Sequence, residues 1–240
     1  MKLEKSLFQR SHIYFIVFFF FMLWGFWLTY FVKIFEQENY RMHAHGITLI
    51  LWCLMLIVQP YLIRTKKRPL HRAVGKFSYL LVPLLVITTL DLLHFRMTGN
   101  AGLKTLDYVF VALVVNALVV FLIMYGLAIV NKSKPTVHAR YMLCTAFPMF
   151  TPITDRIIYL FFPSAVPHMP TIEGNPIVPI VGFVLADLLL FGLCIWDWRS
   201  HRRWNVFPFA LLLLVAYHLS VFHFYKFQFW RDFSSWFAGL

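Results

Sequence analysis

The chain has 240 residues, of which 60% are hydrophobic and only 13% are charged. A water-soluble domain of this length needs more polar surface than this composition supplies. The net charge of +12 does not indicate nucleic-acid binding, because the Lys and Arg residues gather in short segments between long apolar runs, as in membrane proteins. We therefore predict an integral membrane protein whose main partner is the lipid bilayer.

Apolar runs of about twenty residues recur along the chain, and each is long enough to cross a bilayer as a helix. Helices are expected because a spanning segment must satisfy its own backbone hydrogen bonds. The fold class is predicted to be all-α, a polytopic membrane helical bundle forming a single transmembrane domain over residues 1–240. The seven predicted transmembrane helices are 12–33, 44–64, 73–96, 105–130, 141–162, 175–197 and 206–226.

The distribution of basic residues predicts the orientation of these helices. The N-terminal segment and every second connection hold most of the Lys and Arg, so these segments are expected on the cytoplasmic side. The N-terminus is then inside and the C-terminus outside, in what we predict to be a bacterial cytoplasmic (inner) membrane. The pattern leaves the oligomeric state open.

The second and third predicted helices carry ionisable residues near their outer ends. His43 and His45 begin the second, and they can chelate one ion only at a frayed helix start, because i and i+2 point apart in a regular helix. Asp91 and His94 share one face of the third. Asp91 could orient His94 toward a metal, or the two could form a hydrogen-bonded pair that joins helices.

The fourth and fifth predicted helices also contain polar residues. Asn116 is expected to form an interhelical hydrogen bond. Pro148 and Pro152 are expected to kink the fifth helix. Asp155 and Arg156 follow these prolines and are candidate catalytic residues, with a structural salt bridge as the alternative.

The last two predicted helices contribute an acid and two histidines. Asp187 lies near the middle of the sixth, either as a proton-relay group or as a neutral hydrogen-bond donor. His218 and His223 lie about 140° apart around the seventh, so at most one of them is expected in any site, and His218 is the deeper. The cysteines lie in separate helices, where we expect packing rather than a disulfide or metal site: Cys53, Cys144 and Cys194.

Two predicted cytoplasmic helix starts combine a histidine with an arginine. These are His71 with Arg72 and His138 with Arg140. Together with nearby lysines they could hold an anionic lipid headgroup or a phosphate. The alternative is the ordinary basic flank of a membrane helix.

The segment 43–79 resembles a group of uncharacterised bacterial multi-span membrane proteins. The shared pattern is a His-rich helix start, a Gln and an Arg near the inner end, and a Leu-His-Arg-x-x-Gly motif, here His43, His45, Gly46, Gln59, Arg64, Leu70, His71, Arg72 and Gly75. The resemblance implies a helical membrane fold and no particular activity. A fainter similarity is to seven-span zinc hydrolases related to the adiponectin receptors. The paired histidines in the last helix of that family are four residues apart, whereas His218 and His223 are five residues apart.

Two classes of function fit these residues. The first is a membrane metalloprotein with iron, zinc or copper, or with a b-type haem held by two histidines, acting as an oxidoreductase or a lipid-directed hydrolase. Its candidate ligands are His43, His45, Asp91, His94 and His218. The second is a cofactor-free protein, either a proton-coupled transporter with Asp155 and Asp187 as relay groups or a structural membrane subunit.

Overall fold

The computed structural model describes residues 2–98 and 102–240, with side chains from residue 10 onward. Within these ranges, six helical stretches are long and apolar enough to cross a membrane, namely Arg10–Phe31, Tyr40–Arg64, Arg68–Met97, Thr105–Val130, Pro179–His201 and Val206–Lys226. They match six of the seven predicted helices to within a few residues. The all-α fold class and the membrane helices are therefore confirmed, whereas the orientation stays a prediction.

The chain divides into two compact units, residues 1–92 and residues 93–240, which we call unit 1 and unit 2. Helix α3 (Arg68–Met97) belongs mainly to unit 1 and ends in unit 2. Each unit is described by itself below. The prediction of one transmembrane domain stays a prediction.

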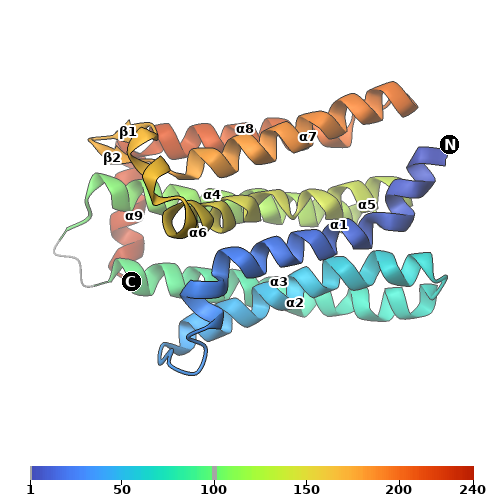
Figure 1. The fold of residues 1–240 in the computed structure, drawn as a ribbon, viewed down its shortest axis with the longest axis horizontal. Coiled ribbons are helices and arrows are strands. Elements are labelled where there is room, and N and C mark those ends of the chain that lie inside the picture. The colour runs from blue at the N-terminus through green and yellow to red at the C-terminus, as the bar shows by residue number, and fades with distance from the viewer. Residues whose placement is uncertain (1, 99–101) are drawn as a thin grey trace. The chain divides into compact units, whose positions relative to one another are not determined.

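Unit 1 consists of three long helices. Helix α1 (Lys2–Phe26) continues as a π-helical turn, η1 (Trp27–Phe31), and packs against α2 (Tyr40–Arg64). Helices α2 and α3 run in opposite directions (Figure 1). The start of α2 is fixed by Asn39, whose side-chain oxygen accepts the Arg41 backbone N–H at 3.0 Å, as expected of an N-cap residue.

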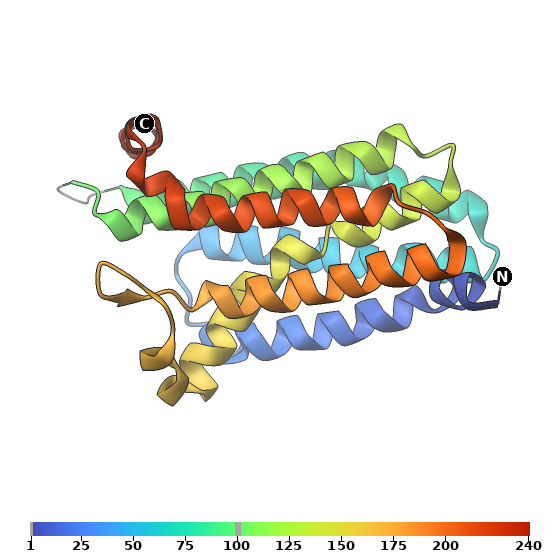
Figure 2. The same cartoon turned by 90° about the horizontal axis from the view of Figure 1, so that it is seen from above.

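Unit 2 contains the remaining elements. In chain order they are α4 (Thr105–Val130), α5 (Pro135–Cys144), η2 (Phe147–Met149), α6 (Phe150–Phe161), η3 (Pro163–His168), β1 (Thr171–Ile172), β2 (Asn175–Pro176), α7 (Pro179–His201), α8 (Val206–His223), η4 (Phe224–Lys226) and α9 (Gln228–Ala238). The antiparallel β1–β2 pair and α9 lie at the same end of α4, α7 and α8 (Figures 1 and 2). We call this end the hairpin end of unit 2.

The fifth predicted transmembrane helix is interrupted rather than continuous. Helix α5 ends at Cys144 and α6 begins at Phe150, with the 3₁₀ turn η2 between them. Pro148 lies inside this turn, and a proline both lacks an N–H donor and clashes with the preceding helical turn. The expected kink is thus confirmed, and it is strong enough to divide the helix in two.

Helices α6 and α7 approach each other closely at Gly182. A methyl group added at Gly182 would lie 2.5 Å from Thr154 Oγ1 and 2.6 Å from Thr151 Cα. Only glycine fits at this distance, as is common where helices cross in membranes. This crossing brings the first turn of α6 against the first turn of α7.

Candidate functional site

Helix α8 presents three buried polar side chains within four positions, each toward a different helix. Ser220 Oγ accepts a 2.7 Å hydrogen bond from Asn116 Nδ2 of α4, which confirms the interhelical role expected of Asn116. Tyr217 lies beside the Thr151 side chain of α6. His218 meets α7. Since all three α8 side chains are buried, this part of α8 lies inside the bundle of unit 2.

The contact between His218 and Asp187 joins two titratable groups. His218 Nδ1 lies 3.0 Å from Asp187 Oδ2, and the His218 side chain is 7% exposed. The imidazole ring stacks on the Phe183 ring with a centroid distance of 4.0 Å and an interplanar angle of 20°. The imidazole nitrogen and the carboxylate oxygen are therefore within hydrogen-bond distance, and Phe183 covers one face of the imidazole.

Three buried oxygens in unit 2 have no hydrogen-bond partner among the described residues. They are Asp187 Oδ1, Asp155 Oδ1 and the Tyr217 hydroxyl. The Tyr217 side chain lies close enough to the Asp155 carboxylate to interact with it electrostatically. Buried polar atoms in proteins almost always have a partner, so three such atoms on neighbouring helices call for an explanation, such as a bound water, an ion or a chemical role.

The predicted catalytic residues Asp155 and Arg156 lie on α6. Arg156 Nη1 donates a 2.7 Å hydrogen bond to the Pro152 carbonyl oxygen, and its guanidinium interacts electrostatically with Asp155 and with Arg96. Asp155 thus has a nearby positive charge but keeps one oxygen without a partner.

Among the predicted metal or haem ligands, His43 has both ring nitrogens engaged. Nε2 lies 2.7 Å from the Gln37 carbonyl oxygen, so Nε2 carries the proton and donates. Nδ1 then accepts the Tyr30 hydroxyl at 3.0 Å. A side chain at Gly46 would meet the Tyr30 ring at 3.1 Å, which explains the glycine in this motif. His43 therefore connects η1 to α2 instead of presenting a free nitrogen.

The other predicted ligands have separate contacts. His45 Nδ1 lies 3.2 Å from Thr89 Oγ1, and Asp91 Oδ1 accepts a 3.1 Å hydrogen bond from Arg41 Nε. Asp91 is thus paired with Arg41. His94, in unit 2, makes an edge contact with the Phe237 ring of α9, and its buried Nε2 has no hydrogen-bond partner among the described residues. Among the described residues, no three His, Cys, Asp or Glu side chains converge as a metal site would need.

The candidate headgroup residues differ in exposure. Arg72 is exposed. His71 instead lies against the Gln59 amide, which also accepts the Gly75 backbone N–H at 2.9 Å, and His138 Nδ1 donates to the Ala128 carbonyl oxygen at 2.8 Å. The prediction of headgroup binding therefore rests mainly on Arg72 and the neighbouring lysines.

Arg140 is a buried ion-pair partner rather than a surface residue. Its guanidinium donates to both oxygens of Asp197, at 2.8 and 3.1 Å, and the two side chains are 2% and 3% exposed. Arg140 Nη1 also donates to the Thr136 carbonyl oxygen at 3.1 Å, and His201 Nδ1 lies 3.3 Å from Asp197 Oδ1. Sequence reasoning missed Asp197, although an acid within a membrane helix is itself a signal.

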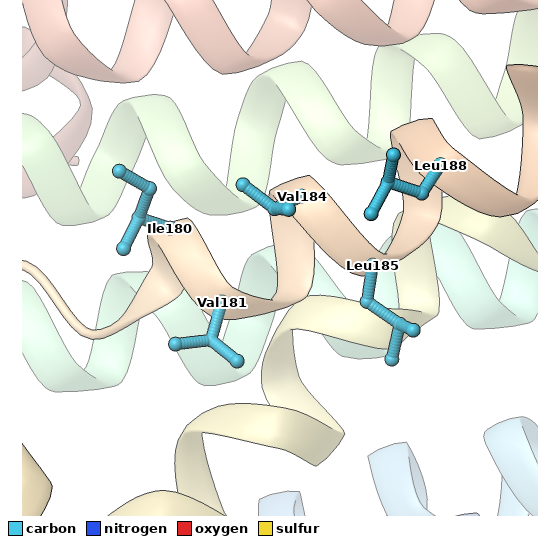
Figure 3. A pocket seen from close by; sticks show the side chains of 5 residues that line it. All are labelled: Ile180, Val181, Val184, Leu185 and Leu188. Carbon is cyan, nitrogen blue, oxygen red and sulfur yellow. The ribbon is translucent and has the colours of Figure 1, made fainter.

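One groove in the apolar surface of unit 2 is lined only by aliphatic side chains. Figure 3 shows this groove of about 430 Å³ along α7, lined by Ile180, Val181, Val184, Leu185 and Leu188. Its aliphatic lining suits lipid chains. The titratable groups instead lie among α6, α7 and α8.

No protein-family model, curated protein or solved structure matches the chain. The functional argument therefore rests on the residues and their contacts.

Proposed function

We propose that this integral membrane protein binds and releases a proton at the Asp187–His218 pair, as part of proton-coupled movement of a small solute. The observation that carries this proposal is the 3.0 Å contact between two titratable side chains on α7 and α8. Both helices are long and apolar enough to cross a membrane. Ionisable groups are costly in such helices and are most often functional there.

The pair has the chemistry that reversible proton binding needs. Histidine is the side chain whose charge ordinarily changes between about pH 5 and pH 8. An adjacent carboxylate stabilises the imidazolium form, while burial favours the neutral form.

The same arrangement supports a second candidate function. A carboxylate that holds one imidazole nitrogen often orients the other toward a metal, and Nε2 of His218 has no hydrogen bond to a described residue. His218 could thus hold iron, zinc, copper or a b-type haem for redox or hydrolytic chemistry. An optical spectrum and metal analysis of purified protein test this, with His218→Gln expected to abolish any bound cofactor.

We also propose that α5 and α6 together form the seventh membrane crossing. Helices of 10 and 12 residues, at about 1.5 Å per residue, span roughly 33 Å, enough for the hydrocarbon core. The N-terminus would then be cytoplasmic and the C-terminus outside. A topology reporter fused after Leu240 would read extracytoplasmic, and a cytoplasmic signal would contradict the seven-crossing arrangement.

The proton site is tested by nitrogen-15 NMR of the histidine rings in lipid nanodiscs. The wild type should show one buried imidazole that protonates reversibly between about pH 5 and pH 8, with its signal absent in His218→Gln and shifted in Asp187→Asn. His223→Gln, five positions further along, is the matched control and should retain the signal. A His218 ring that keeps one protonation state throughout would overturn the proposal.

A further inference from the structure

Unit 2 contains a second acid whose position extends the proposed proton site toward the hairpin end. Asp155 follows Thr151 by one helical turn on α6, and Thr151 is the residue that touches Gly182 of α7. Asp187 lies five residues beyond Gly182, away from the hairpin end.

Tyr217 lies between these two acids. Its ring makes an edge contact with Phe183 at 5.6 Å, beside the His218 ring that stacks on Phe183. Its hydroxyl lies beside Thr151 and within Coulombic range of Asp155. The side chain thus reaches from the level of His218 toward Asp155.

The orphaned oxygens indicate what connects the two acids. Three buried oxygens of this region have no protein partner, namely Asp155 Oδ1, the Tyr217 hydroxyl and Asp187 Oδ1. Buried waters in proteins typically bind such otherwise unsatisfied groups, making about three hydrogen bonds each.

We propose that Asp155 is a second proton-binding residue, connected to the Asp187–His218 pair through Tyr217 and internal waters that bind the three orphaned oxygens. This inference rests on the proposed function. Asp155 carboxylic acid gives its proton to an adjacent water and becomes a carboxylate. Each water and the Tyr217 hydroxyl accept one proton and release another, so they are unchanged. The Asp187–His218 pair gains the proton.

Charged and titratable groups lie on both sides of the Asp187–His218 pair. Toward the hairpin end, α6 supplies Asp155 and Arg156, and α8 supplies His223. Toward the opposite end, Arg140 of α5 and Asp197 of α7 form a buried ion pair with His201 beside it. The proposed route from Asp155 therefore leads to the pair from the hairpin end.

The route is tested by the rate at which the Asp187–His218 pair responds to a rapid pH jump, followed by time-resolved infrared spectroscopy in nanodiscs. Tyr217→Phe and Asp155→Asn should each slow this response roughly tenfold or more, as expected when a positioned proton donor is removed. Tyr79→Phe, an exposed tyrosine of α3, is the matched control and should respond at the wild-type rate.

The outcomes separate the two proposals. If the pair still titrates but Tyr217→Phe and Asp155→Asn respond as fast as the wild type, the route is wrong and the proton site stands. If the wild-type pair does not titrate, the proton site itself fails and the route fails with it. Retained NMR spectra of the two variants establish that they are folded.

Discussion

Units 1 and 2 both place polar side chains inside long apolar helices, but they engage these side chains differently. In unit 1 both ends of α2 are tied to neighbouring helices, through His43 to Tyr30 and through Arg64 to His12 at 2.8 Å. In unit 2 the buried His218 meets the partly exposed Asp187, near oxygens without protein partners.

This difference distinguishes polar side chains that hold helices together from polar side chains that have another role. In a membrane, hydrogen bonds between helices contribute modestly to stability, and satisfied groups need no further explanation. A buried polar group without a hydrogen bond destabilises the folded protein. Its presence is explained when it binds a ligand or a water, or when it takes part in a reaction. By this criterion the motif residues of unit 1 hold helices together, which is consistent with the site that we propose in unit 2.

The largest expected effect concerns a satisfied pair in unit 2. Arg140→Gln leaves the Asp197 carboxylate buried without its cation and should lower the free energy of unfolding by about 3–5 kcal/mol. The double variant Arg140→Gln with Asp197→Asn should recover much of this loss. Thermal unfolding in detergent measures both. A single variant as stable as the wild type would show that the pair contributes little.

A smaller effect is expected at the α6–α7 crossing. Gly182→Ala pushes a methyl group against Thr151 and Thr154 and should cost about 1–3 kcal/mol, as overpacking does. Gly192→Ala, on the same helix where a methyl group meets nothing within 4 Å, is the control and should be neutral or slightly stabilising. Equal effects at the two glycines would contradict the close approach. Unfolding midpoints decide between these results.

In unit 1, loss of a helix connection should reduce stability without changing proton chemistry. Tyr30→Phe removes the hydroxyl that binds His43 and should cost about 0.5–1.5 kcal/mol. The exposed Tyr40→Phe provides the matched control. If Tyr30→Phe changed the titration of the His218 imidazole, the distinction between the two units would be contradicted. Unfolding and the histidine NMR spectrum are measured on the same samples.

The smallest predicted effect is the coupling between Thr48 and Thr88, whose hydroxyls lie 3.0 Å apart. A double-mutant cycle with Val at both positions should give a coupling of about 0.6 kcal/mol, typical of hydrogen bonds between membrane helices. Coupling above about 2 kcal/mol would mean that unit 1 polar contacts have more than a packing role.

The sequence predicted the membrane helices well because length and hydropathy alone specify them. It also identified Asp187, His218 and Asp155 as polar groups inside such helices. It did not predict which acid pairs with which base, because pairing depends on how helices turn toward each other. Asp91 thus meets Arg41 rather than orienting His94, and Arg140 reaches Asp197 across 57 positions of the chain. The hydrogen bonds of the two ring nitrogens of His43 likewise could not be predicted from its position in the sequence.

The comparison between the units is tested most directly by one substitution made in each, Asp187→Asn and Asp91→Asn. The measurement is the number of protons that the purified protein in nanodiscs takes up between about pH 8 and about pH 5. Asp187→Asn should change this uptake by about one proton, whereas Asp91→Asn should leave it unchanged and lower only the stability. Unchanged uptake in Asp187→Asn, or an equal change in both variants, would contradict a proton site in unit 2.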